Sequence, residues 1–246
     1  MVVTHKCTAA KYLAKMPVNE WGQPIGEPMV DWKPSEVPQH KVLKGKYCTL
    51  VKPSLDHAGS LFEAHKGAPQ DWTYMFPGPF DDLEPFKQLM QEKVDSTDPL
   101  HFTVIDNQTG EPVGTLSFLR IDPANGSIEV GHVTFSNRMK NSFMSTEAQF
   151  LMMREAFDGL KYRRYEWKCD SLNGPSNAAA KRLGFQYEGL FRNNIVYNNR
   201  SRDTAWYSII DSEWPKLCSA LEAYLSDENN KDGKQVKPLK EFIKNI

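Results

Sequence analysis

With 246 residues, of which 40% are hydrophobic and 11% aromatic, the chain is long enough to bury a sizeable core and is expected to be globular. Its formal net charge of −1 gives no argument for nucleic acid or an anionic membrane as a general partner. The sequence has no apolar run long enough to span a bilayer and no N-terminal secretory signal, so it predicts a cytoplasmic protein.

The cysteines and histidines favour neither a disulfide framework nor a metal site. Cys7, Cys48, Cys169 and Cys218 lie far apart without metal-binding spacing, which indicates reduced thiols in packing roles. The histidines also show no ligand spacing. His132 is expected to be a hydrogen-bonded strand residue rather than a metal ligand or a base. We therefore expect no metal.

The two ends of the chain differ from its centre. Five prolines between residues 16 and 42 disfavour regular helix or sheet there, and Trp21 and Trp32 favour an arm packed on the domain over a disordered linker. The stretch 227–237 is polar and without an apolar period, which predicts a mobile tail before a short amphipathic piece at 239–246. We therefore divide the chain into an arm (1–44), a domain (45–225) and a tail (226–246).

The domain begins with elements of mixed type. The residue pattern predicts a strand at 47–52, a helix at 55–66, an aromatic loop at 67–80 and an amphipathic helix at 83–94. Strands at 100–106, 113–121 and 127–135 follow in series, because the turns between them carry hairpin residues. The first three of the six later elements are a helix at 146–158, a strand at 163–170 and a short helix that ends at Gly184. Strands at 186–192 and 204–210 and a helix at 213–225 complete the series.

This order predicts a mixed sheet. A strand at 127–135 that reaches the strand at 163–170 through a helix must pair with it in parallel, whereas the hairpin neighbours pair antiparallel. We therefore expect an α/β (α+β) fold with a mostly antiparallel central sheet and helices on both faces.

The stretch 127–185 combines several features in a recognisable order. The strand at 127–135 leads into a basic turn with Arg138 and Lys140, and Thr146 with Gln149 forms a capping-box pattern that predicts a helix N-terminus after this turn. The strand at 163–170 is followed by Asn173-Gly174-Pro175-Ser176-Asn177, and the short helix ends at Gly184-Phe185.

That order resembles the acyl-CoA-binding core of the GNAT N-acetyltransferases, closest to the RimJ/RimL-like branch, and the resemblance spans residues 45–221. The family's loop pattern is Gln/Arg-x-x-Gly-x-Gly/Ala, and here Arg138 matches it while Asn141 and Phe143 stand at the two small positions. Asparagine tolerates the left-handed backbone conformation that glycine adopts. The following residues are expected to contact acetyl-CoA, the co-substrate that the resemblance implies: Val133, Thr134, Phe135, Arg138, Lys140, Asn141, Ser142, Phe143, Ser145, Thr146, Asn173, Ser176 and Asn177.

The resemblance also implies catalytic positions. Glu188 matches the base of the RimL-like branch, Cys169 its second catalytic group, and Ser176 is expected near the CoA thiol. The family's tyrosine acid is replaced by Ala180, so the acid role falls to Ser176, Cys169 or water, or is absent. A carboxylate in an apolar cleft has its pKa raised towards the range useful for a base. Four carboxylates are therefore candidates for the base, Glu188 first and then Glu129, Asp170 and Glu166.

We therefore expect an enzyme that transfers an acetyl group from acetyl-CoA to a primary amine, either a protein N-terminus or a small molecule. No nucleic acid or membrane partner is expected, and the protein is expected to be a monomer or homodimer. The substitutions at positions 143 and 180 leave open a catalytically weak CoA-binding or sensing module. A scaffold that no longer binds CoA is the remaining alternative. The acceptor does not follow from the sequence, because acceptor loops vary freely on a fixed scaffold.

Overall fold

A computed structural model describes residues 17–244 of the chain. The chain divides into two compact units, residues 1–33 and 34–246. Within the described part of the first unit, the Asn19 side chain accepts hydrogen bonds from the amides of Trp21 and Gln23, and an isolated bridge joins Val18 to Pro24. This unit therefore contains a local turn and no regular helix or strand in its described residues, as the prolines predicted. That the arm packs on the domain remains a prediction.

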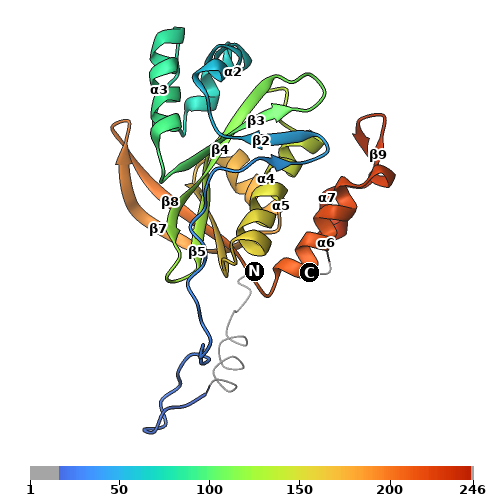
Figure 1. Ribbon diagram of the computed structural model, residues 1–246. Coiled ribbons are helices and arrows are strands. Elements are labelled where there is room, and N and C mark those ends of the chain that lie inside the picture. Colours follow the sequence, from blue (N-terminus) through green and yellow to red (C-terminus); the bar gives the residue numbers. More distant parts are fainter. Residues whose placement is uncertain (1–16, 245–246) are drawn as a thin grey trace, which may run out of the picture. The chain divides into compact units, whose positions relative to one another are not determined.

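The second unit is built on an eight-stranded mixed sheet (Figure 1). The strand order is β1-β2-β3-β4-β5-β6-β8-β7, and every neighbouring pair is antiparallel except β5 and β6. The predicted mixed, mostly antiparallel sheet is thus confirmed. The strands are β1 (Leu43–Lys44), β2 (Cys48–Val51), β3 (Leu100–Asp106), β4 (Pro112–Asp122), β5 (Ser127–Phe135), β6 (Arg164–Asp170), β7 (Gln186–Tyr197) and β8 (Arg200–Ile210).

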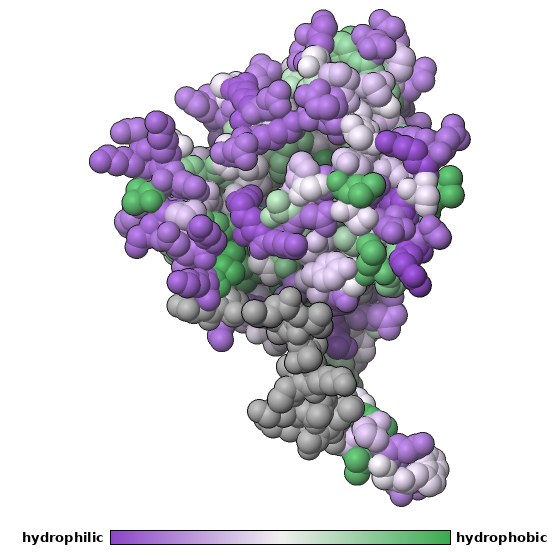
Figure 2. Space-filling view, turned by 180° about the vertical axis from the view of Figure 1, so that it is seen from behind, coloured by the Kyte–Doolittle hydropathy of each residue, from purple (hydrophilic) through white to green (hydrophobic). Residues whose placement is uncertain are grey.

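The helices pack in two separate hydrophobic clusters, and only the larger one contains residues of the sheet. One cluster lies between α2 (Ala58–His65) and α3 (Leu83–Asp95), with the 3-10 turns η1 (Leu55–His57) and η2 (Pro69–Trp72) beside them. The larger cluster joins the sheet to α4 (Phe143–Arg154), α5 (Gly174–Arg182) and α6 (Trp214–Leu225). Because side chains alternate along a strand, Ile128 and Val130 face the larger cluster while Glu129 faces the other way. Hydrophilic residues dominate the surface visible in Figure 2, with hydrophobic residues scattered among them.

A buried carboxylate fixes α4 against the start of the sheet. Glu147 accepts hydrogen bonds from the backbone amides of Lys46, Tyr47 and Cys48 at 2.7, 2.6 and 2.8 Å. A Cβ at Gly45 would lie only 2.5 Å from the Glu147 carboxyl carbon. The close approach therefore requires glycine at position 45. The hydrogen bonds of Glu147 fix α4 relative to the start of the sheet.

The polar segment after α6 has more structure than the sequence analysis predicted. It forms the 3-10 turn η4 (Asp227–Asn229), a hairpin of β9 (Asn230–Lys231) and β10 (Lys234–Gln235), and α7 (Leu239–Ile243). Asn229 is buried and donates to the carbonyl oxygens of Tyr224 and Lys237. Hydrogen bonds between side chains and the backbone order this segment. Such bonds do not need a periodic pattern of apolar residues, so the sequence analysis did not detect the order.

Candidate functional site

The sheet opens between its two parallel strands. Pairing of β5 with β6 runs from Ser127 opposite Arg164 to Val130 opposite Trp167 and ends there. Beyond this point β5 continues to Phe135 paired with β4, and β6 continues to Asp170 paired with β8. The two strands therefore diverge rather than end. Backbone groups on the facing edges beyond Val130 and Trp167 have no partner in the opposite strand and are available to a ligand.

A β-bulge lies at the start of this opening. Ser117 of β4 pairs with Gly131 and Thr115 pairs with Thr134, so that His132 and Val133 together oppose the single residue Leu116. His132 has a left-handed backbone with φ of 49°. A bulge redirects the backbone groups of the longer strand. Val133, Thr134 and Phe135, which the resemblance assigned to acetyl-CoA, occupy this bulged end of β5.

The helix after the basic turn begins earlier than predicted. Ser142 is the N-cap of α4, and its hydroxyl accepts a hydrogen bond from the amide of Ser145. The start predicted at Thr146 was wrong by three residues, because Thr146 is fully buried inside the helix and accepts a hydrogen bond from Arg182 at 3.0 Å. The Thr146/Gln149 pattern is therefore not a capping box.

The two unusual residues of the basic turn are both accommodated. Asn141 has φ of 57°, the left-handed conformation that the sequence analysis invoked for it. Phe143 is buried, and its ring centroid lies 5.3 Å from that of Tyr47 and 5.3 Å from that of Tyr224. The Phe143 side chain thus belongs to the core. The first amides of α4, which lack partners within the helix, remain a suitable place for an anionic group.

The two cations expected at the phosphates already have anionic partners. Arg138 contacts the buried carboxylate of Asp106 at 2.7 Å and the Thr109 hydroxyl at 2.9 Å. Lys140 pairs with Asp71 and donates to the Asn137 side chain. A phosphate would have to share or replace these contacts.

The loop between β6 and α5 forms the other side of the opening. Asn173 caps α5 by accepting a hydrogen bond from the amide of Ser176 at 3.1 Å. Asn177 donates to three backbone carbonyls of the loop and accepts from the Tyr207 hydroxyl at 2.7 Å. Gly184 has φ of 93° and is followed by a buried Phe185, which confirms the predicted end of this helix.

The residues proposed for proton donation near the opening are held in place by hydrogen bonds or burial. The Ser176 hydroxyl accepts from the Trp167 indole at 3.0 Å. Burial raises the pKa of the Cys169 thiol, which favours its protonated form. Ala180 is fully buried.

Glu188 forms an ion pair with Arg164 on the face of the sheet opposite to the one that α5 covers. Arg164 donates to both of its carboxylate oxygens, and the Ser208 hydroxyl donates at 2.7 Å. These contacts, Arg164 first, lower the pKa of Glu188. The direction is opposite to the rise that the sequence analysis expected for a base.

The other candidate carboxylates are also partnered. Glu129 is 5% exposed and pairs with Lys168 at 2.9 Å and with Arg120 at 3.0 Å, and burial raises its pKa. Glu166, which lies opposite Glu129 in the parallel register, pairs with Lys168 at 2.7 Å. Asp170 accepts from the Tyr197 hydroxyl at 2.8 Å. Glu129 and Glu166 therefore belong to the closed part of the sheet, before the strands diverge.

His132 is hydrogen-bonded, as expected, but the sequence analysis missed the polar cluster beside the bulge to which this partly buried side chain belongs. His132 contacts the Ser117 hydroxyl at 3.1 Å, and its ring centroid lies 5.3 Å from that of His101. Lys93 of α3 donates to the hydroxyl of Thr115 at 2.9 Å. Burial and the charge of Lys93 lower the pKa of His132 to about 4, and burial lowers that of Lys93 to about 8. The members come from four elements, so no local sequence pattern indicates the cluster.

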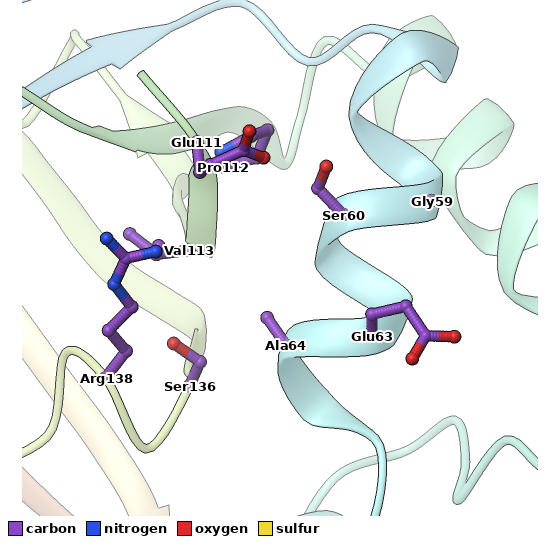
Figure 3. A pocket seen from close by; sticks show the side chains of 9 residues that line it. All are labelled: Gly59, Ser60, Glu63, Ala64, Glu111, Pro112, Val113, Ser136 and Arg138. Carbon is purple, nitrogen blue, oxygen red and sulfur yellow. The ribbon is translucent and has the colours of Figure 1, made fainter. Parts of the chain in front are cut away.

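A pocket of about 440 Å³ lies beside the basic turn but apart from the opening. One wall is the face of α2 with Ser60 and Ala64, and the other is formed by Val113, Ser136 and Arg138 (Figure 3). No residue of 130–133 or 167–170 lines it. The pocket therefore neighbours the turn that leads to α4 without being the diverging part of the sheet.

Within residues 17–244, no cluster of three or more His, Cys, Asp or Glu side chains has an arrangement that would hold a metal ion. In the same part of the chain, no helix has the length and apolar character needed to cross a bilayer.

Comparison with known proteins places this geometry among acetyltransferases. Residues 48–186 match the family model described as acetyltransferase (GNAT) domain. The chain is 30% identical over 169 residues to the uncharacterized N-acetyltransferase p20 of Bacillus licheniformis, covering 68% of this chain and 94% of that protein. It is 30% identical over 138 residues to a ribosomal-protein-serine acetyltransferase of Escherichia coli (strain K12), covering 51% of this chain and 76% of the relative.

A solved structure agrees with these sequence matches. The crystal structure of a GCN5-related N-acetyltransferase from Brucella melitensis superimposes with a TM-score of 0.85 at 42% identity, covering 87% of this chain and 99% of that chain.

Proposed function

Because the chain belongs to the GNAT acetyltransferase family, in its RimJ/RimL-like branch, we propose that it transfers an acetyl group from acetyl-CoA to a primary amine. Acyl transfer from acetyl-CoA is the chemistry of this family. The observation that carries the proposal is the opening between β5 and β6 beyond Val130 and Trp167, with a bulge on one side and a helix N-terminus after it.

The residues at the opening fit an acyl-CoA. The bulged end of β5, residues 131–135, supplies backbone groups for the pantetheine and the thioester oxygen. The first turn of α4 supplies amides and a positive dipole end for the pyrophosphate. Asn173, Ser176 and Asn177 line the opposite side at the start of α5. Bound acetyl-CoA would supply the activated acetyl group.

We propose two classes of acceptor, a protein N-terminus and a small-molecule amine. The similarity to a ribosomal-protein-serine acetyltransferase supports the first class. The alternative is a catalytically weak CoA-binding module. Phe143 no longer supports that alternative, because its ring packs in the core rather than in the turn. Ala180 in place of a tyrosine remains the observation that favours it.

The proposed base from the resemblance is Glu188, with Glu129 as the second carboxylate. Glu188→Gln tests this role, since glutamine keeps the size of the side chain but cannot take a proton. We also propose that the protein acts in the cytoplasm, where acetyl-CoA and nascent N-termini are available, as a monomer or homodimer.

Release of CoA thiol from acetyl-CoA in the presence of an amine panel tests the proposed function. The panel should contain short peptides with different N-terminal residues and a set of small amines. Acetyl-CoA at 100 times its dissociation constant should stabilise the protein by about 2.7 kcal/mol. Binding with amine-dependent thiol release supports the enzyme, whereas binding without release by any amine supports the CoA-binding module. No change in melting temperature at millimolar acetyl-CoA contradicts both.

A further inference from the structure

The hydrogen bonds of Ser117 determine which nitrogen of a neighbouring imidazole carries the proton. The Ser117 hydroxyl donates its one hydrogen to the carbonyl oxygen of Gly131 over 3.1 Å. When that hydrogen is used there, Nδ1 of His132 is the donor in its contact of 3.1 Å with the Ser117 hydroxyl, and this is the tautomer that we assign. Nε2 is then the unprotonated nitrogen, and within residues 17–244 it has no hydrogen-bond partner.

The surroundings keep this imidazole neutral. Lys93 of α3 and His101 of β3 are the titratable groups that face it, and both are buried. Burial first, and then the charge of Lys93, place the pKa of His132 near 4. At neutral pH the ring therefore presents a lone pair at Nε2 rather than a second N–H.

His132 also lies at the start of the opening in which the proposed function places the acetyl group. It is the first residue of the bulge, two positions beyond the last pair between β5 and β6, and its side chain is only partly buried. It contacts Ser117 and His101 on the face of the sheet covered by α3, whereas α5 and its loop lie on the other face. An amine that approaches from the α3 side reaches the opening beside this ring.

We propose that Nε2 of His132 accepts the proton that the acceptor amine loses during acetyl transfer, and that Ser117 positions the ring for this role. The inference rests on the proposed function. In the step, the nitrogen of the neutral amine forms a bond to the acetyl carbonyl carbon, and the carbon–sulfur bond breaks with its electron pair leaving on the CoA sulfur. The amine proton passes to Nε2 and then to the thiolate, so the products are the amide and the CoA thiol.

The carboxylates are less suited to this step. Glu129 lies before the strands diverge and has Lys168 and Arg120 against it. Glu188 is held by two nitrogens of Arg164, which favours its charged form and occupies both oxygens. Among the candidates, His132 alone combines a position in the opening with an unprotonated nitrogen that has no partner in the described residues.

Turnover of three variants tests the assignment. His132→Gln keeps a donor for Ser117 but has no group that takes a proton, so its kcat should fall by about 10²-fold or more with the affinity for acetyl-CoA unchanged. Glu188→Gln should lose less than about tenfold. His40→Phe is the matched control, because His40 packs edge-on against Phe102 and, within residues 17–244, makes no hydrogen bond or ring contact with Ser117 or His132, so this variant should retain the turnover of the parent.

Nuclear magnetic resonance of the histidine ring nitrogens gives a readout that is independent of turnover. In the unliganded protein, His132 should be neutral with the proton on Nδ1 from about pH 5 to 8. Ser117→Ala should increase the share of the other tautomer. A cationic ring at pH 7, or a proton on Nε2 in the parent, overturns the proposal.

The outcomes separate the two levels of inference. If the parent releases thiol with an amine but His132→Gln does so within about threefold of it, the role of His132 fails while the proposed function stands. If the parent binds acetyl-CoA and no amine is acetylated, the proposed function fails and the role of His132 fails with it. If only His132→Gln loses turnover, and the His132 ring of the parent carries its proton on Nδ1, the results support the proposed function and the role of His132.

Discussion

The two halves of the contact between β5 and β6 differ in how their polar groups are used. In the closed half, the strands are paired up to Val130 and Trp167, and Glu129, Lys168 and Glu166 compensate one another. In the open half, backbone groups lack partners across the gap and His132 presents an imidazole nitrogen without a partner in the described chain. Charged side chains in the closed half therefore pair with one another within the sheet. In the open half, the backbone groups and the imidazole nitrogen without such partners are free to contact a ligand.

The largest effect on stability should come from the closed half. The Lys168 side chain is 6% exposed and lies between the carboxylates of Glu129 and Glu166. Lys168→Met leaves two buried carboxylates without their shared cation, so the free energy of unfolding should fall by about 3 to 5 kcal/mol. Urea denaturation measures this change.

A surface lysine provides the control for this substitution. Lys87 pairs with Glu84 on the exposed side of α3, and Lys87→Met should change stability by less than about 1 kcal/mol. Equal effects of the two substitutions would show that burial does not distinguish the Lys168 network from a surface pair. The comparison of the two halves would then lose its physical basis.

A smaller effect is expected at the basic turn. Arg138→Ala removes the cation that contacts the buried carboxylate of Asp106, and should lower stability by about 1 to 3 kcal/mol. Because the first turn of α4 supplies the proposed phosphate site, the affinity for acetyl-CoA should change less than tenfold. Calorimetric titration in low and high salt measures it. A loss of affinity that is large at low salt and screened at high salt would instead assign Arg138 to the phosphates.

The smallest effect should come from Glu188, and it should depend on pH. Arg164 lowers the pKa of Glu188 below its unfolded value of about 4.3, so the ion pair stabilises the protein above that value and stops doing so as the pH falls through the folded pKa. The stability difference between the parent and Glu188→Gln should therefore be present at pH 7 and shrink towards pH 3. A difference that grows on acidification would contradict the ion pair.

The sequence predicted the fold well because periodicity and turn residues are local signals. The strand at 127–135 is reproduced to the residue, and the helix predicted at 83–94 is one residue longer. The helix start after the basic turn was misplaced, because Thr146 matches a cap pattern while the packing of Phe143 between two tyrosines extends the helix to Ser142.

The site was predictable only where neighbouring residues form it. Asn173, Ser176 and Gly184 act locally around α5, and the sequence analysis described their structural setting. The bulge at His132 depends on the register of β4 against β5, and the ion pair of Glu188 depends on Arg164, 24 residues away in the chain. Contacts between residues far apart in the chain have no local sequence pattern. The sequence analysis therefore expected a raised pKa for Glu188, whereas its contact with Arg164 lowers it.

Hydrogen exchange of the backbone amides with and without acetyl-CoA tests the central claim most directly. If acetyl-CoA occupies the open half, amides of residues 131–135 and of the first turn of α4 should gain protection. Amides of 127–130, already paired in the closed half, should change little. Unchanged exchange in residues 131–135 under saturating acetyl-CoA, or protection confined to another part of the chain, would contradict the assignment of the opening between β5 and β6 as the acetyl-CoA site.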